Sequence, residues 1–321
     1  MSSTDNNEKF YLLPYESIHR EAWNAFVYKS KMPCFLFDRD YMEYHSDRFK
    51  DASLIVFKGK EIFALFPCNS ANGNIYSHQG LTYGGLIYDI DAHAVEVICT
   101  FKIIADYFKE RDFKKIVYKA IPYIFHVYPA SEDMYALNVL GAKIYRRDIS
   151  SVIELGKRPK LSDSRKSTAR KSEKIGASIS ILTSDEEVSD FHGLLTSVLG
   201  KFNTKPTHSL SELLLLRSRF PENIKIYGVT HQEKLLAGSV IYDFDQVVHT
   251  QYLATSEEGK KIGALDFLLK SLIEEMYRDR KYFSFGISTE ADGIYLNEGL
   301  IRQKEGFGGR GVVNDFYQLE L

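Results

Sequence analysis

The feature that most constrains the fold is an internal repeat, because the two halves of the chain carry similar segments in the same order. In the second half, β-type runs at 224–229, 235–244 and 247–254 are joined by short polar turns, which is typical of an antiparallel meander. A long amphipathic segment, a strand, a short helix and a final strand follow. The first half repeats this order from residue 54 onward. A shared order along both halves predicts two similar units.

The helical segments and the closing strands fix where the halves meet. In the second half, one continuous apolar face is formed by Leu265, Leu268, Leu269, Leu272, Ile273 and Met276. In the first half, the segment from Ala92 to Lys109 carries a similar face of Val97, Phe101, Ile104 and Phe108. Each half closes with a strand that ends in Glu-Leu, at Leu155 and Leu321. We therefore predict units at 1–155 and 156–321, and a chain of 321 residues is long enough to form two cores.

The composition is that of an ordinary globular protein. A net charge of −2 provides no general attraction to nucleic acid or to an anionic membrane. No apolar run approaches the roughly 18 residues of a spanning helix, and Met1 to Lys9 lacks the apolar core of a signal peptide. The three cysteines lie far apart and have no metal-ligand spacing. We expect a cytoplasmic protein with no membrane insertion and no metal.

Several short stretches support a family resemblance. They are the basic segment Arg165–Lys171, Leu236-Ala237-Gly238 with Gln251–Ala254, Phe285–Ser288 with Asn297–Gly299, Lys304–Gly308, and the glycine-rich Ser77–Gly85. Together they resemble the FemAB-like branch of the GNAT acyltransferase superfamily, some of whose members are acetyltransferases and others peptidyltransferases that use aminoacyl-tRNA. The resemblance implies an α/β fold of two tandem GNAT-type units, each a mixed, largely antiparallel sheet flanked by helices. It also implies chemistry in the cleft between the units.

The predicted donor loop departs from the family pattern. GNAT enzymes that use acyl-CoA usually carry Arg/Gln-x-x-Gly-x-Gly/Ala before the long helix. The nearest match runs from Lys260 to Leu265 and differs at its first and last positions. Lys260, Lys261 and Gly263 at a helix N-terminus can still hold phosphate, although Glu257 and Glu258 oppose an anion there. We predict acetyl-CoA or another acyl-CoA as donor, in the second unit, with Ala254 also in the cofactor site.

The predicted catalytic residues follow from what acyl transfer needs. The resemblance implies that two central strands splay near Tyr252, where backbone N–H groups polarise the acyl carbonyl. Tyr252 is predicted to protonate or position the leaving group, and Lys304 to bind phosphate or stabilise negative charge. Glu290 is the predicted general base, with Asp292 as an alternative. No cysteine lies in a nucleophile context, which favours direct transfer. His249 is interpreted as structural.

Substrate contacts are predicted in both halves. In the first, His78 and Tyr83 lie in a loop whose glycines allow close backbone approach, and in the second, Ser288 ends a strand. The first unit is predicted to serve the acceptor and to have no donor site. The basic stretch 157–174 is either a solvated surface or a site for a phosphorylated donor such as CoA or tRNA.

Three functions remain open from the sequence. The leading hypothesis is an N-acyltransferase that moves an acyl group from acyl-CoA to an amine of a small molecule, amino sugar or peptide. The second is a FemAB-type peptidyltransferase that uses aminoacyl-tRNA and acts on a cell-wall precursor. The third is a non-catalytic binding module that has lost activity in both units. The sequence does not identify the acceptor, the acyl group or the oligomeric state.

Overall fold

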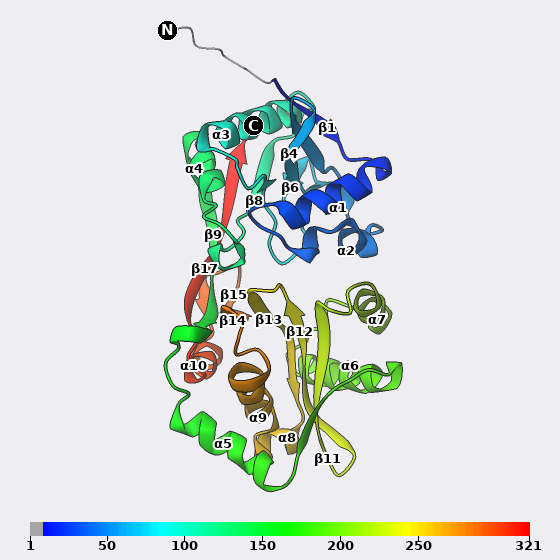
Figure 1. Ribbon diagram of the computed structural model, residues 1–321, viewed down its shortest axis with the longest axis vertical. Coiled ribbons are helices and arrows are strands. Elements are labelled where there is room, and N and C mark those ends of the chain that lie inside the picture. The colour runs from blue at the N-terminus through cyan, green and yellow to red at the C-terminus, as the bar shows by residue number, and fades with distance from the viewer. Residues whose placement is uncertain (1–8) are drawn as a thin grey trace. The chain divides into compact units, whose positions relative to one another are not determined.

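The computed structural model describes residues 9–321, and its internal contacts divide the chain into two compact units (Figure 1). Unit 1 comprises the chain up to Arg147 together with Val313–Leu321, and unit 2 comprises Asp148–Val312. This division differs from the predicted split at residue 155, because the last strand returns to the first unit. The prediction that Met1–Lys9 lacks a signal-peptide core concerns residues that lie, except for Lys9, outside those described.

Unit 1 contains a four-stranded antiparallel sheet in the order β1-β3-β4-β7. Its strands are β1 (Phe10–Pro14), β3 (Leu54–Lys58), β4 (Glu61–Phe66) and β7 (Ile87–Tyr88). The other strands of the unit lie in the order β17-β8-β6-β5-β2, where β6 and β8 are parallel. They are β2 (Lys50–Asp51), β5 (Asn69–Ala71), β6 (Asn74–Tyr76), β8 (Lys115–Lys119) and the end of β17 (Arg310–Glu320).

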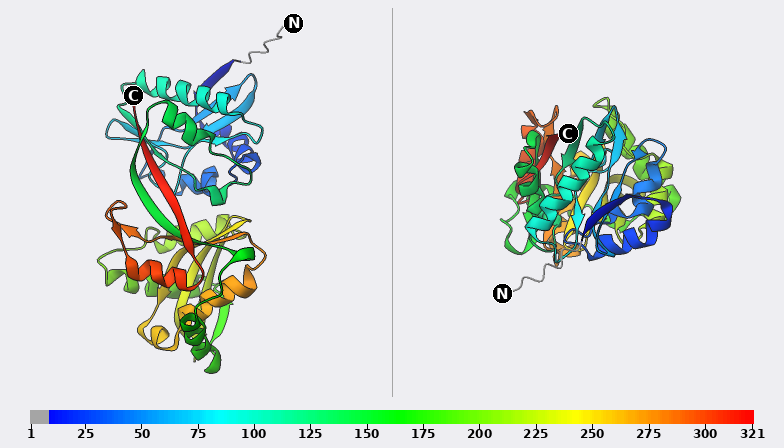
Figure 2. Two further views of the ribbon diagram at one scale, coloured as in Figure 1. Left: turned by 90° about the vertical axis from the view of Figure 1, so that its left-hand side faces the viewer. Right: turned by 90° about the horizontal axis from the view of Figure 1, so that it is seen from above.

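The helices of unit 1 bury the apolar faces that the sequence predicts. They are α1 (Arg20–Lys29), α2 (Arg39–Met42), α3 (Ala94–Lys109) and α4 (Glu132–Val139), with short 3₁₀ turns at Ser17–His19, Phe35–Phe37, Glu43–His45 and Tyr123–Phe125. The predicted face of α3, from Val97 to Phe108, is buried. In the right-hand view of Figure 2, seen from above, α3 lies over the strands of the unit. The core beneath it includes Phe101 packed on Tyr118.

Unit 2 is a mixed sheet with helices on both faces. The strand order is β10-β11-β12-β13-β14-β9, and only the β13–β14 pair is parallel. The strands are β9 (Lys143–Glu154), β10 (Ser178–Ile181), β11 (Ile224–His231), β12 (Lys234–Asp243), β13 (Val247–Thr255) and β14 (Tyr282–Ile287). The helices are α5 (Asp163–Lys174), α6 (Asp185–Gly200), α7 (Leu210–Arg219), α8 (Glu257–Ile262), α9 (Ala264–Ser271) and α10 (Glu298–Gly306), with a 3₁₀ turn at Leu155–Lys157. In Figure 1, α6 and α7 lie on one side of this sheet and α9 on the other.

Two predicted helices of unit 2 differ from the structure. The long helix is α-helical only to Ser271 and continues as a π-helix over Leu272–Met276. The wider π-helical turn shifts the following side chains around the helix axis. Met276 is therefore exposed, while Ile273 stays buried. The short helix begins at Glu298, because the side chain of Asn297 caps it by accepting from the backbone N–H of Leu300 at 2.9 Å.

The sequence pattern predicts the short helix over residues 295–302, but the segment before α10 forms a hairpin. Its two strands are β15 (Thr289–Glu290) and β16 (Tyr295–Leu296). Across residues 9–321, no helix combines the length and apolar composition needed to cross a bilayer.

Candidate functional site

The parallel strands β13 and β14 of unit 2 separate after a short ladder. They pair over three positions only, the last joining His249 to Ser284. Strand β13 continues to Thr255, where it is paired with β12. The edge of β13 that faces away from β12 is therefore released from the described sheet beyond His249. This divergence is the strand splay that the family resemblance predicts.

A β-bulge lies at the same place. On β12, Val240 pairs with Tyr252 and Ile241 pairs with Thr250, so Gln251 is an extra residue in β13. A bulge re-aims backbone groups and commonly lies next to a site. The bulge and the splay together leave main-chain groups near Gln251 outside the regular ladder, where an N–H can polarise a carbonyl.

Lys304 brings a positive charge to the end of β14. Its side chain is 4% exposed, and Nζ donates to the carbonyl oxygens of Gly286 at 3.0 Å and Ile287 at 2.6 Å. Burial lowers the pKa of Lys304 to about 8. The ammonium is held by carbonyl oxygens, and no carboxylate among its described partners neutralises its charge.

His249 lies at the point where the strands separate. Its Nδ1 is hydrogen-bonded to the Ser284 hydroxyl at 3.1 Å, and its ring lies within 3.8 Å of where a side chain at Gly286 would begin. Burial, and then the charge of Lys304, lower the pKa of His249 to about 4. The imidazole is therefore neutral at physiological pH.

Two buried hydroxyls near the splay have no hydrogen-bond partner among the described residues. They belong to Thr250 on β13 and to Ser288 just after β14. The backbone of Ser288 is fixed, since its N–H donates to Ile149 at 2.8 Å. Most buried polar groups are paired in folded proteins, so these hydroxyls are candidates to contact a ligand.

Tyr252 is held by a residue that the sequence did not single out. Its hydroxyl accepts from the backbone N–H of His208 at 3.2 Å and lies 2.7 Å from that residue's Nδ1. His208 is buried in the loop before α7, and its carbonyl accepts from His192 at 3.1 Å. Burial raises the pKa of Tyr252. No local motif marks His208, which lies 44 positions from its partner.

The other predicted catalytic residue, Glu290, lies on the β15–β16 hairpin. Its carboxylate accepts from Asn297 at 2.7 Å and is exposed. The described contacts therefore join Glu290 to the N-cap of α10, and they do not join it to Tyr252 or Lys304.

The predicted donor loop is packed against α5. Gly263 has a φ of 76°, and a Cβ there would lie 2.4 Å from the carbonyl oxygen of Thr168. The Ser172 hydroxyl donates to the carbonyl of Ile262 at 2.8 Å. Lys260 pairs with Glu257 at 3.0 Å, while Lys261 is exposed. The start of α9 is thus covered by the backbone of α5.

The remaining predicted donor residues also belong to unit 2. Ala254 is buried on β13, opposite Gly238. The basic stretch lines a separate cavity of about 650 Å³, which includes Lys157, Arg158, Lys160, Lys166 and Glu274. Arg158 is paired with Glu274 at 3.2 Å. The other three cations give this cavity a net positive charge.

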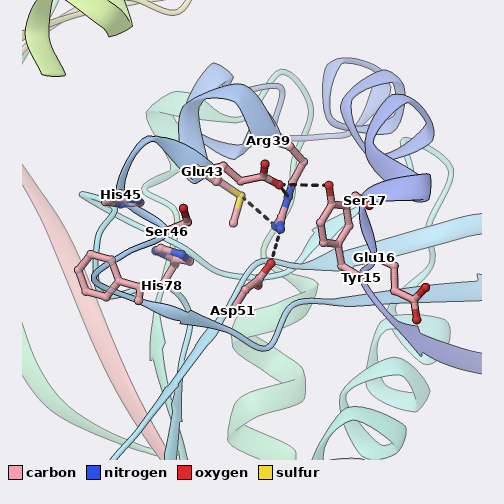
Figure 3. A pocket seen from close by; sticks show the side chains of 11 residues that line it. Tyr15, Glu16, Ser17, Arg39, Glu43, His45, Ser46, Asp51 and His78 are labelled. Atoms are coloured by element: carbon pink, nitrogen blue, oxygen red, sulfur yellow. Dashed lines mark hydrogen bonds and ion pairs between the residues drawn. The ribbon is translucent and has the colours of Figure 1, made fainter. Parts of the chain in front are cut away.

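His78 of unit 1 lines a pocket of about 250 Å³ (Figure 3). The lining residues are Tyr15, Glu16, Ser17, Arg39, Met42, Glu43, His45, Ser46, Phe49, Asp51 and His78. Tyr83, predicted with His78, does not line it. The Tyr83 side chain is 4% exposed and packs on Phe125, with 4.4 Å between ring centroids. The structure therefore places one of the two residues at a cavity and the other in the aromatic core.

The comparisons with known proteins agree with this architecture. No protein-family model matches the chain, and no curated protein matches it. Among solved structures it is similar to FemX, with a TM-score of 0.69, 11% identity and 97% of each chain covered. It is also similar to L-PGS from Bacillus licheniformis, with a TM-score of 0.63, 12% identity and coverage of 94% of this chain and 91% of that one.

A third similar structure has the same two-unit construction. It is a tandem GNAT protein from the clavulanic acid biosynthesis pathway, with a TM-score of 0.54, 12% identity and coverage of 97% of this chain and 98% of that one. At such identities the likeness concerns the fold. The predicted fold of two tandem GNAT-type units is confirmed.

Proposed function

We propose that this protein is an acyltransferase that moves an acyl group from an activated donor to an amine. The observation that carries the proposal is the splay of β13 and β14, with a bulge at Gln251 and the buried ammonium of Lys304 at the end of β14. These features supply what acyl transfer needs most, which is positive potential where a carbonyl oxygen becomes negative.

The reaction follows from these groups. A neutral amine attacks the acyl carbonyl carbon, and the carbonyl oxygen takes the electron pair while backbone N–H groups near Gln251 and the Lys304 charge stabilise it. The intermediate then collapses, the new C–N bond remains, and the donor's thiolate or alkoxide leaves. Tyr252 is the proposed proton source for that leaving group, and Glu290 is the proposed acceptor of the amine proton. Ser288 is proposed to contact the substrate.

The first candidate donor is acyl-CoA, with Ala254, Lys260, Lys261 and Gly263 as the proposed cofactor site. A thioester is an activated acyl donor, and the start of α9 provides backbone N–H groups.

A second candidate donor is aminoacyl-tRNA. The observation that favours it is the packing of α5 on Gly263, which covers the backbone where a pyrophosphate is expected. The pairing of Lys260 with Glu257 also reduces the positive charge there. A donor that carries its acyl group as an ester, and does not place a pyrophosphate at this loop, avoids both obstacles. The basic cavity at Lys157–Lys166 is compatible with such a polyanion.

Calorimetric titration with acetyl-CoA and desulfo-CoA tests the first donor. Micromolar binding that is weakened in Lys260→Ala/Lys261→Ala supports it, and Lys109→Ala/Lys114→Ala is the control that removes the same charge from unit 1. Absence of binding to both compounds overturns the acyl-CoA proposal. Charged tRNA with a cell-wall precursor is then the donor to test, and lack of turnover there too would favour a binding module.

A further inference from the structure

The pocket of unit 1 has a charge distribution that none of the proposed chemistry uses. Arg39 forms its inner wall and is 2% exposed. The guanidinium donates to Glu43, Asp51 and Ser53, and lies 3.5 Å from the centroid of the Tyr15 ring. Figure 3 shows Arg39 between Glu43 and Asp51. The cation is therefore covered and its hydrogen-bonding groups are engaged.

The carboxylates of the pocket remain partly accessible. The side chains of Glu43 and Asp51 are 28% and 39% exposed, and Glu16 lies at the rim. Outside the pocket, Arg20 pairs with both Asp40 and Glu43. Among the lining residues, three carboxylates outnumber one buried guanidinium, so the lining carries a surplus of negative charge, which Arg20 reduces at Glu43.

The opposite wall offers a hydrogen-bond donor. The backbone N–H of Gly80 donates to Nδ1 of His78 at 3.3 Å, so Nε2 of the neutral ring carries the proton. Burial, and then the neighbouring His45, lower the pKa of His78 to about 3, which keeps the ring neutral. His78 is 4% exposed, and no partner of its Nε2 is described within residues 9–321. This N–H can donate to an acceptor oxygen of a ligand in the pocket that His78 lines.

Aromatic rings complete that wall. Phe49 lies 4.9 Å from His45 and 5.5 Å from His78, measured between ring centroids. The loop approaches so closely that a Cβ at Gly80 would lie 2.1 Å from Nε2 of His45. The faces of these rings suit the C–H groups beside a cation.

We propose that this pocket binds a small hydroxylated organic ammonium, such as an amino sugar. Its ammonium lies at Asp51 and Glu43, a hydroxyl oxygen accepts from Nε2 of His78, and its apolar face lies on Phe49. A cavity of about 250 Å³ admits one sugar-sized group. An ammonium held by carboxylates is not nucleophilic, so a ligand that is also the acceptor of the proposed reaction must carry a second amine.

Binding of glucosamine, measured by calorimetry on the full chain, tests the proposal, with glucose and inorganic phosphate as comparison probes. We expect glucosamine to bind at least tenfold more tightly than either. The Glu16→Lys variant should weaken glucosamine binding about tenfold, because it replaces a negative charge at the rim by a positive one. Glu21→Lys makes the same change on an exposed part of α1 outside the pocket and should leave affinity unchanged.

The position of the ligand is checked separately. Glucosamine should shift the Nε2 resonance of His78 in a histidine-labelled sample, and Phe49→Leu should weaken binding. Equal affinity for glucose, tighter binding of phosphate, or glucosamine binding that leaves His78 unperturbed would each overturn the inference. These measurements need no turnover, so their outcome is independent of the acyltransferase proposal. That proposal is tested by the donor experiments.

Discussion

Lys304 combines burial with a charge that no described carboxylate balances. A buried ammonium loses hydration, and its two bonds to backbone carbonyls replace only part of that hydration. A methionine of similar length would fill the same space without this cost. This cost is the reason why we propose that the charge serves the chemistry at the end of β14.

Replacement of Lys304 by methionine separates these roles. We expect kcat to fall by about 10²–10³, the size of effect seen when a stabilising group for the oxyanion is lost. The free energy of unfolding should change by no more than about 1–3 kcal/mol, because removal of the buried charge offsets the loss of a donor to the two carbonyl oxygens. Steady-state kinetics and urea unfolding measure the two quantities. Arg302→Met, on the exposed face of the same helix, is the control and should keep kcat. Full activity in Lys304→Met would refute the proposed role.

His249 should make stability depend on pH. Its folded pKa of about 4 lies below the usual 6.5, so between these values the unfolded chain binds a proton that the folded chain does not. Stability from this residue is present above about pH 6.5 and is lost as the pH falls toward 4. His249→Asn should therefore reduce the slope of unfolding free energy against pH by up to about 1.4 kcal/mol per unit.

Denaturant unfolding at several pH values measures this slope. His231→Asn, which changes a histidine at the end of β11, is the matched control and should keep the wild-type slope. An unchanged slope in His249→Asn would contradict the assignment.

For single residues, the sequence predicts a role only where the residue type and its near neighbours in the chain form a recognisable pattern. Lys304 was singled out from the family resemblance and His78 from a loop whose glycines allow close backbone approach, and the roles of both stay predictions. His208 was missed, and Tyr83 was placed with the substrate although it packs in the core. Both outcomes depend on contacts between distant positions, such as His208 with Tyr252, which no short pattern records.

Among the elements, the junction of α5, α8 and α9 is where the sequence pattern says least about what a ligand can reach. The sequence of the α8–α9 turn resembles a phosphate loop, but packing decides whether its backbone can be reached. Periodicity predicted the long helix and its buried face, whereas the π-turn after Ser271 has no signature in the apolar spacing. Short sequence patterns predict whether a segment is helix or strand. Whether its backbone is accessible to a ligand depends on how the element packs against its neighbours.

Substitution of Gly263 by alanine tests this junction. The left-handed φ of 76° costs alanine about 1–2 kcal/mol, and the Cβ would overlap the Thr168 carbonyl, so we expect a loss of at least about 2 kcal/mol in unfolding free energy. Gly299→Ala near the start of α10, where the nearest heavy atom is 3.6 Å from the added Cβ, should be neutral or stabilising. Equal stability of the two variants would show that α5 does not press on Gly263.

Over the whole molecule, the two compact units are not two consecutive segments of the chain. Strand β17 begins in unit 2 and ends in unit 1, where Phe316–Glu320 pairs with β8. Within unit 1, Asp315 receives two hydrogen bonds from Arg147 and its carbonyl accepts from the backbone N–H of Ala120. A repeat pattern predicts two similar units but does not record that the last strand completes the first.

This return predicts that unit 1 depends on the end of the chain. Leu319 is 4% exposed in unit 1, so Leu319→Ala should lower the stability of that unit by about 2–5 kcal/mol. Trp23 is the single tryptophan and is fully buried in unit 1, so its fluorescence reports this unit alone. We expect the urea midpoint of Trp23 fluorescence to fall in Leu319→Ala and to stay constant in Val313→Ala, whose side chain is 46% exposed. An unchanged midpoint in Leu319→Ala would mean that the side-chain packing of the last strand does not contribute to the stability of unit 1.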